Sequence, residues 1–266
     1  MNNNFNDLLN KFKNICDKKW IPSVSNGHGT IGLTFEHELG KKVDTEYTPD
    51  YKDIEIKCST RYSRHNITLF SVAFDGPSKK EIIRLNDNYG SADIDFPDKK
   101  TLMKTINSNH LSQLKSGYYL SLEVNKDKLF LLVYDKNKNL IEKQSFIYLE
   151  TIKKHLLTKI NNLAYIKASK KKINEKEYFR YYEISLYTLK SFNIFIELLL
   201  NGDIDVTIMS RISKSGSSVG RYFNKNLVFQ IKQKNIEKLF NFLHYYNHDK
   251  KIALNDYSQT EDFQIL

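Results

Sequence analysis

Residues 47–58 read Tyr47-Thr48-Pro49-Asp50-Tyr51-Lys52-Asp53-Ile54-Glu55-Ile56-Lys57-Cys58, and they predict a turn that ends at Asp50, followed by a short strand. Side chains alternate between the two faces of a strand. Glu55 and Lys57 should therefore point one way, while Ile54 and Ile56 point the other way into a core. Asp50 stands at the mouth of the same strand. The pattern predicts that two carboxylates and one ammonium group converge on one point.

This set of residues suits chemistry on a phosphodiester. Carboxylates are hard oxygen ligands for Mg²⁺, which activates water and neutralises charge on the phosphorus centre. A lysine can orient the attacking water or help to deprotonate it. Asp50 and Glu55 are therefore candidate metal ligands, and Lys57 is a candidate water-positioning group. The alternative is an exposed strand with a surface Glu/Lys pair. However, Glu-x-Lys occurs only once in the chain, inside an apolar alternation.

Composition sets the broad class of the protein. A chain of 266 residues permits one large domain or a two-lobed one, and a hydrophobic content of 40% is enough for a core. The net charge of +10 suits a polyanionic partner, although Lys, Asn and Ile are used heavily throughout. Cys16 and Cys58 form no CxxC motif, so we expect a reducing cytoplasm and neither a disulfide framework nor a zinc site. We expect no signal peptide and no membrane partner.

Apolar periodicity predicts mixed α and β structure in which strands outnumber helices. A short helix should be capped by Thr34 and ended by Gly40. The other expected helices cover residues 5–15, 98–107, 149–160, 191–200 and 236–246. The expected strands cover residues 67–74, 118–124, 129–134, 163–168, 178–189, 204–212 and 227–231.

Two glycine-rich loops, residues 25–32 and 213–221, allow the backbone to approach DNA or a neighbouring strand closely. The first leads into the short helix, where Glu36 or Glu38 could face the Asp50/Glu55 cluster. For Glu38 we favour a solvated helix face. The basic run Lys167–Lys176 is expected to be a solvated loop, with phosphate contact as the alternative.

Several sequence blocks together resemble the MvaI/BcnI restriction endonucleases, which are relatives of MutH and Sau3AI among the PD-(D/E)xK nucleases. The resemblance to MvaI is closer than the resemblance to BcnI. They keep their order from residue 26 to about residue 240. The blocks are the first glycine-rich loop running into Leu33-Thr34-Phe35-Glu36, Pro49 to Lys57, Leu69-Phe70, Ala164-Tyr165-Ile166, Ile173 to Tyr178, and Asn201 to Val206.

The resemblance implies a PD-(D/E)xK core, with a mixed central sheet flanked by helices and a second, DNA-recognition lobe. The expected lobes are approximately residues 1–135, mainly catalytic, and 136–250, mainly for recognition, followed by a polar tail, 251–266. It further implies a monomeric, magnesium-dependent type II restriction endonuclease acting on double-stranded DNA, with Mn²⁺ as a substitute metal. Asp50, Glu55 and Lys57 match the family's catalytic positions, and Glu36 matches its accessory helix glutamate.

The chain departs from the MvaI pattern where that pattern carries two base-reading histidines. Residues 222–226 read Tyr-Phe-Asn-Lys-Asn here, so the recognition sequence does not transfer. We expect residues 211–226 to be the main base-reading segment, since asparagine can pair with adenine edges and arginine with guanine. For Lys214 a contact with phosphate alone is favoured. The candidate DNA-binding residues are Lys214, Arg221, Asn224, Lys225 and Asn226, together with Arg61 and Arg64 in a basic turn.

Three other functions remain open from the sequence. The chain could be a repair or defence nickase similar to MutH, a DNA-binding protein whose nuclease fold has lost activity, or a metal-free binding module. The intact Asp/Glu/Lys set argues against loss of activity. A cognate DNA methyltransferase encoded nearby is the partner expected for a restriction enzyme.

Overall fold

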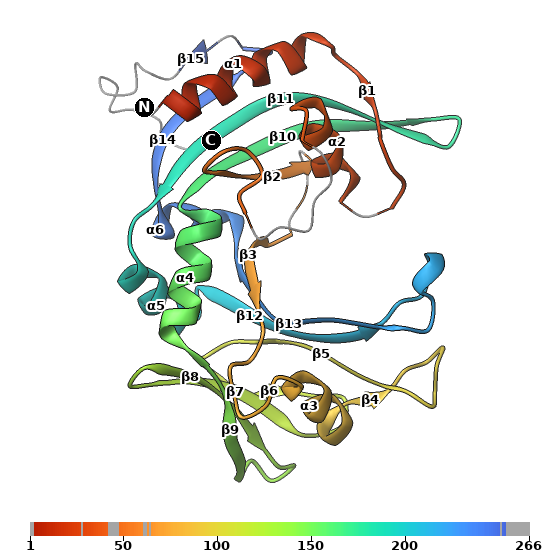
Figure 1. Ribbon diagram of the computed structural model, residues 1–266, viewed down its shortest axis with the longest axis vertical. Helices are drawn as coiled ribbons and strands as arrows, with labels where there is room; N and C mark the ends of the chain where they lie inside the picture. Colours follow the sequence, from red (N-terminus) through yellow and green to blue (C-terminus); the bar gives the residue numbers. More distant parts are fainter. Residues whose placement is uncertain are drawn as a thin grey trace, which may run out of the picture. The chain divides into compact units, whose positions relative to one another are not determined.

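The computed structural model describes residues 3–27, 29–41, 48–60, 63, 65–250 and 252–253. The chain divides into two compact units, which Figure 1 draws. Unit 1 comprises Met1–Arg64, Thr158–Lys190 and Phe240–Leu266, and unit 2 comprises His65–Leu157 and Ser191–Leu239. The sequence predicts two consecutive lobes that meet near residue 135, whereas both observed units are assembled from segments far apart in the chain.

Unit 1 is built on a six-stranded mixed sheet in the order β15-β14-β11-β10-β2, with β1 paired to β11. Strands β2 and β10 run parallel, and the other pairs are antiparallel. The strands are β1 (Ile21–Pro22), β2 (Ile54–Thr60), β10 (Asn162–Ile173), β11 (Lys176–Leu189), β14 (Phe240–Asn247) and β15 (Ile252–Ala253). The helices are α1 (Asn3–Asp17), α2 (Thr30–Glu38) and the end of α4 (Leu149–Ile160).

The core of unit 1 lies between its sheet and helix α1, which Figure 1 shows running along the sheet. The periodicity that predicts α1 is confirmed, because its apolar side chains are buried. Phe12 lies 6.1 Å from the ring of Phe35 on α2, and Phe35 meets Tyr181 of β11 edge-on at 5.0 Å. Ile54 and Ile56 of β2 are buried in the same core. Each such side chain contributes ~1.5–3 kcal/mol, so the orientation of β2 is firmly set.

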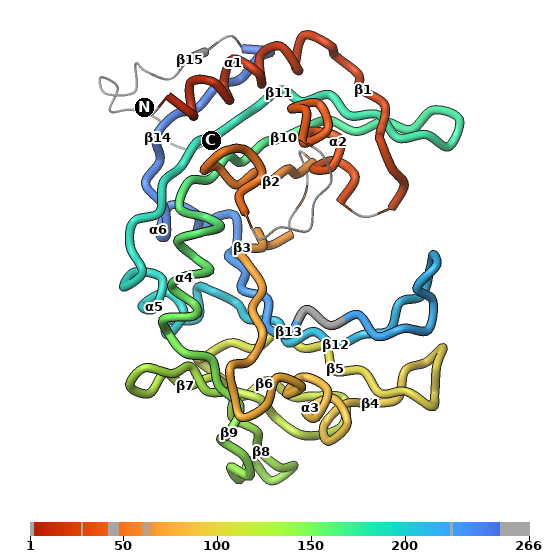
Figure 2. The backbone as a smooth tube through the Cα atoms, viewed as in Figure 1, coloured from red at the N-terminus to blue at the C-terminus, as the bar shows by residue number. Residues whose placement is uncertain are grey.

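Unit 2 contains a five-stranded sheet in the order β3-β13-β12-β5-β4 and a four-stranded sheet in the order β6-β7-β8-β9. Figure 2 follows the long β12–β13 hairpin out to a single 3₁₀ turn, Gly216–Ser218. The strands are β3 (Ile67–Val72), β4 (Ser91–Ala92), β5 (Lys100–Ile106), β6 (Ser112–Gln113), β7 (Tyr119–Asn125), β8 (Lys128–Tyr134), β9 (Leu140–Tyr148), β12 (Ile204–Ile212) and β13 (Tyr222–Ile231). The helices are α3 (Glu81–Tyr89), α5 (Phe192–Leu200), α6 (Ile236–Leu239) and the rest of α4.

Two expected helices are wrong. The helix expected over residues 236–246 ends at Leu239, and Phe240–Asn247 is strand β14, which pairs with β11. Its aromatic residues favour a strand once a partner edge is present. The helix expected over residues 98–107 is strand β5, which pairs with β12. Leu102 and Ile106 are both buried, and their spacing of four residues fits one face of a helix as well as one face of a strand, so the pairing with β12 decides the outcome.

Three local expectations are also corrected. Helix α2 begins at Thr30, inside the glycine-rich loop, after Gly29 in the left-handed region (φ 83°), so Thr34 is a buried helix residue and not a cap. Gly40 does follow the helix, with φ 82°. The basic run from Lys167 lies on the β10–β11 hairpin and not in a loop. Residues 222–226 belong to β13, so this end of the expected base-reading segment is a strand arm, while residues 213–221 connect the two strands.

Mixed α and β structure, with strands outnumbering helices among the described residues, is confirmed. In that same part of the chain, every helix is too short or too polar to cross a membrane.

Candidate active site

A tight turn brings Asp50 back onto strand β2. Tyr51 and Ile54 exchange backbone hydrogen bonds of 3.0 and 2.8 Å, and Lys52 between them has a φ of 52°. The turn reverses the chain, so that Asp50 Oδ2 accepts a hydrogen bond from the backbone N–H of Ile56 at 3.0 Å. The carboxylate is thereby held beside the strand that carries Glu55. The convergence predicted from the sequence is present.

Three ammonium groups surround the two carboxylates. Lys57 Nζ lies 2.5 Å from Glu55 Oε1, as the shared strand face predicts. Lys159 Nζ, from the last turn of α4, lies 3.0 Å from Glu55 Oε2. Lys41 Nζ lies 3.0 Å from Asp50 Oδ1. Lys41 and Lys159 are the site residues that the sequence analysis missed. Nothing in their local sequence marks them, because only the tertiary fold brings them to β2.

The pKa values of Asp50 and Glu55 shift in opposite directions in this environment. Burial raises the pKa of Glu55, and the nearby charge of Asp50 adds to that effect against the opposing charge of Lys57. Burial also acts to raise the pKa of Asp50. The hydrogen bond from Ile56 and the ion pair with Lys41 outweigh it, so the pKa of Asp50 lies below its ordinary value. Asp50 is thus the more readily ionised of the pair.

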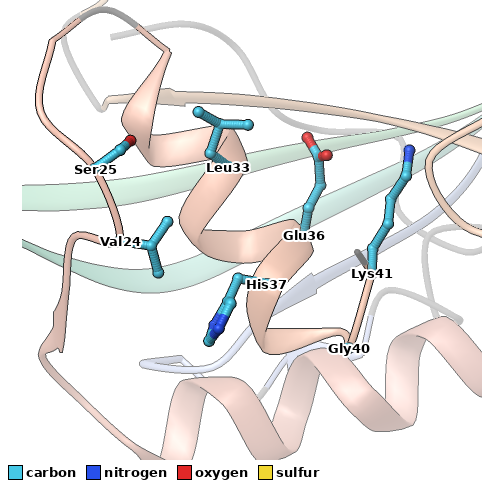
Figure 3. A pocket seen from close by; sticks show the side chains of 7 residues that line it. All are labelled: Val24, Ser25, Leu33, Glu36, His37, Gly40 and Lys41. Atoms are coloured by element: carbon cyan, nitrogen blue, oxygen red, sulfur yellow. The ribbon is translucent and has the colours of Figure 1, made fainter. Parts of the chain in front are cut away.

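Glu36 on α2 is electrostatically part of the same cluster. Burial raises its pKa, and the negative charge of Asp50 raises it further. Glu36 and Lys41 line a pocket of about 600 Å³. Figure 3 shows their side chains projecting in the same direction. Glu38 does not join the cluster, because its carboxylate pairs with Lys18 at 2.6 Å. The pocket is lined by Val24, Ser25, Leu33, Glu36, His37, Gly40 and Lys41.

The donor set fits a hard divalent cation. Glu55 Oε2 is a buried oxygen that receives no hydrogen bond, since the approach of Lys159 satisfies charge but not hydrogen-bond geometry. Within the described ranges, no three His, Cys, Asp or Glu side chains are grouped so that they could hold a metal ion by themselves. Mg²⁺ commonly uses one or two carboxylates and takes its other ligands from water and substrate phosphate. Asp50 and Glu55 could hold Mg²⁺ in that way.

The tip of the β12–β13 hairpin is tied to the segment between β4 and β5. Lys214 Nζ lies 2.7 Å from Asp95 and 3.3 Å from Asp93. Lys99 Nζ donates a hydrogen bond of 2.7 Å to the carbonyl of Gly220. Lys214, expected to contact DNA, therefore has two carboxylate partners within the protein.

The other candidate DNA-binding residues are only partly described. Arg221 is exposed just before β13. Asn226 is half-buried with a φ of 53°, and it pairs with Met209 in the strand register. Asn224 and Lys225 continue the backbone of β13, but their side chains lie outside the described part. Arg61 and Arg64 also lie outside the described residues.

Comparison with known proteins points to one family. The model of the MvaI/BcnI restriction endonuclease family matches residues 9–240. The solved structure of restriction endonuclease MvaI in complex with cognate DNA is similar to this chain, with 26% sequence identity and a TM-score of 0.85. MvaI in the absence of DNA shares 25% identity, with a TM-score of 0.57. Each match covers 91% of this chain and 98% of the MvaI chain. A comparison of this chain with curated protein sequences found no match.

Proposed function

Because this chain belongs to the MvaI/BcnI restriction endonuclease family, we propose that it cuts double-stranded DNA at a short specific sequence with Asp50, Glu55, Lys57 and a bound Mg²⁺ ion. The chain is a type II restriction endonuclease, a site-specific deoxyribonuclease. The observation that carries the residue assignment is the convergence at β2. Asp50 is fixed by the N–H of Ile56, and Glu55 is paired with Lys57.

When bound, Mg²⁺ supplies charge neutralisation at the phosphate and lowers the pKa of water. Asp50 and Glu55 would hold it through their carboxylate oxygens. Lys57, whose Nζ is positioned by Glu55 at 2.5 Å, orients the water for attack on phosphorus. Glu36 assists, because a carboxyl with a raised pKa can accept and hold a proton near the reacting water.

The choice of Mg²⁺ follows from ligand chemistry. The candidate ligands are carboxylate oxygens, which suit Mg²⁺ and Mn²⁺. We therefore propose Mg²⁺ as the working metal and Mn²⁺ as a substitute. Ca²⁺ should support DNA binding without cleavage, because it acidifies bound water poorly.

The proposed partner is double-stranded DNA, and the net charge of +10 suits it. MvaI has been solved with its cognate DNA substrate, which supports this choice. We assign catalysis to unit 1, which carries all four candidate catalytic residues, and DNA recognition mainly to unit 2. We further propose a monomer in the cytoplasm, accompanied by a DNA methyltransferase that protects the host sequence.

A plasmid cleavage assay tests the proposal. Purified protein with Mg²⁺ should convert unmethylated plasmid to discrete fragments, and excess EDTA should stop the reaction. Sequencing the fragment ends would then give the recognition site and cut position. Full activity in EDTA would exclude the metal role. Random fragment ends would exclude site-specific cutting. Glu38→Ala is a matched control, because this acid lies on the same helix as Glu36 and pairs with Lys18 instead of joining the cluster.

A further inference from the structure

Lys159 is held in place from two sides at the mouth of β2. Its Nζ donates a hydrogen bond of 2.9 Å to the carbonyl of Thr48 and lies 3.0 Å from Glu55 Oε2. Parallel pairing of β10 with β2 begins at Asn162 opposite Ile54. The last turn of α4, three residues earlier, is therefore delivered beside Glu55. The side chain of Lys159 is only 18% exposed, so the ammonium is largely withdrawn from water.

The carboxylate that Lys159 faces is almost completely buried, with 2% of the Glu55 side chain exposed. Its two oxygens are not equivalent. Oε1 has Lys57 at 2.5 Å, whereas Oε2 is buried without a hydrogen bond and has the Lys159 charge alongside. Oε2 is therefore the oxygen without a hydrogen bond, and the Lys159 ammonium lies beside it.

We propose that Lys159 is a positioning residue that acts as a stand-in cation at Glu55 Oε2 and is exchanged for the divalent metal ion. The inference rests on the proposed function, since it takes Glu55 as a metal ligand. A buried carboxylate without a nearby positive charge is costly, and Lys159 supplies that charge before the metal arrives. A divalent ion at Oε2 repels an ammonium group a few ångströms away, so both cannot occupy the same oxygen favourably.

The exchange links metal binding to DNA binding. An ammonium displaced from Glu55 needs a new anionic partner, and a DNA phosphate close to the metal provides one. Metal and DNA then favour each other, because each makes the displacement of Lys159 less costly for the other. The free enzyme should accordingly take up metal weakly, and the DNA-bound enzyme strongly.

A purely structural ion pair makes a different prediction. If Lys159 only fastens the end of α4 to the turn at Thr48, removing its charge should lower stability. It should leave metal affinity unchanged, or weaken it through a disordered Glu55. The two roles therefore predict opposite signs for the effect of charge removal on metal affinity.

The first test measures Mn²⁺ binding to the full-length protein without DNA by electron paramagnetic resonance, near pH 8 to limit competition from protons. Lys159→Met should bind Mn²⁺ about tenfold more tightly than the unchanged protein, because the competing charge is gone. Lys159→Arg, which keeps the charge, should not gain affinity. Lys154→Met on the same helix is the matched control, since Lys154 is exposed. An affinity for Lys159→Met that is equal to or weaker than that of the control overturns the proposal.

A second test needs no substitution, so it stands even where Lys159→Met does not fold. An amine-reactive label, quantified by mass spectrometry, should modify Lys159 slowly in the metal-free protein and several-fold faster once Ca²⁺ is added. Lys154 should label at the same rate in both states. Unchanged or slower labelling of Lys159 in Ca²⁺ contradicts the exchange.

Failure of the inference and failure of the proposed function are distinguishable. If Glu55→Ala abolishes both Mn²⁺ binding and cleavage while Lys159→Met leaves Mn²⁺ affinity unchanged, the catalytic assignment stands and the exchange is wrong. If Glu55→Ala neither weakens Mn²⁺ binding nor slows cleavage, the catalytic assignment itself is wrong, and the exchange is overturned with it.

Discussion

Lys214 Nζ lies 2.7 Å from Asp95 Oδ2, so a lysine expected to bind phosphate has a carboxylate partner within the protein. Asp93 adds a second carboxylate at 3.3 Å, and its own Oδ1 accepts the backbone N–H of Asp95. The segment between β4 and β5 therefore holds the tip of the β12–β13 hairpin from one side. Within unit 2, Lys214 ties the hairpin tip to this segment, and the nearby Arg221 is exposed.

We predict that Asp95→Asn lowers specificity more than stability. An exposed ion pair contributes about 0–1 kcal/mol, so the free energy of unfolding should change little. Lys214 would keep only Asp93, at 3.3 Å, so the hairpin tip should loosen and the lysine charge should be less neutralised. Affinity for random DNA should rise slightly, and the ratio of cognate to random affinity should fall severalfold. Asp98→Asn in the same segment is the control. An unchanged affinity ratio for Asp95→Asn would show that the pair does not position a reading element.

Arg221→Ala and Asn224→Ala should each cost roughly 1–3 kcal/mol of binding to the cognate site and little for random DNA, as expected of base contacts. The measurement is fluorescence anisotropy with cognate and random duplexes over a salt series. A phosphate contact would weaken both duplexes equally and lower the salt slope by about one unit. If neither substitution alters the ratio of the two affinities, base reading lies elsewhere in unit 2.

Glu55→Ala or Lys57→Ala should reduce the cleavage rate by ~10²–10⁴-fold while leaving DNA binding largely intact. The reason is that both groups act at the reacting centre, whereas DNA is held by many contacts over a larger surface. Single-turnover cleavage gives the rate, and binding in Ca²⁺ gives the affinity. Cutting by either variant at the rate of the unchanged enzyme would remove β2 from the active site.

Cleavage should need more metal at acidic pH. Burial raises the pKa of Glu55 above the ordinary value of 4.5, and a protonated carboxyl is a poor metal ligand. The Mg²⁺ concentration for half-maximal cleavage should therefore rise as pH falls through that raised pKa. Asp50 does not add to the effect, because its pKa lies below 3.8. Metal titrations between about pH 5 and about pH 8 test this. A pH-independent metal requirement would contradict it.

Thermal unfolding should also show that metal binding to Glu55 weakens as pH falls. In the metal-free protein, the raised pKa of Glu55 means that stability falls as pH rises through it, because the folded state must then carry a buried charge. The lowered pKa of Asp50 acts in the opposite direction, and its contribution is lost as pH falls through that value. Added Ca²⁺ should therefore raise Tm more at neutral pH than at acidic pH.

Supercoiled plasmid should pass through an open-circle form before it becomes linear. The family resemblance implies a monomer, and the described residues of the chain hold one candidate active site, so the two strands would be cut in separate steps. A time course under limiting enzyme, resolved on an agarose gel, measures the intermediate. Direct appearance of linear plasmid would point to two active sites acting together.

The sequence by itself determined the strand that carries Glu55 and Lys57 and the first helix. Glu55 and Lys57 are two residues apart, so strand alternation alone puts them on one face, and the apolar Ile54 and Ile56 decide which face meets the core. Helix α1 likewise followed from periodicity, because a stripe of buried apolar side chains along a 15-residue helix needs no distant partner to be recognised. These relationships are set by covalent spacing.

Only the tertiary structure decided which other residues join the site and whether the aromatic segment near the C-terminus forms a helix or a strand. Lys159 is about a hundred residues from Glu55, and it reaches that carboxylate because β10 pairs in parallel with β2. Residues 240–247 fit both helical and strand periods. The exposed edge of β11 resolves the choice, because its unpaired backbone groups gain partners only when that segment is extended. Such pairings depend on which strand edges and charged groups still lack a partner when distant segments meet. No local sequence pattern contains that information.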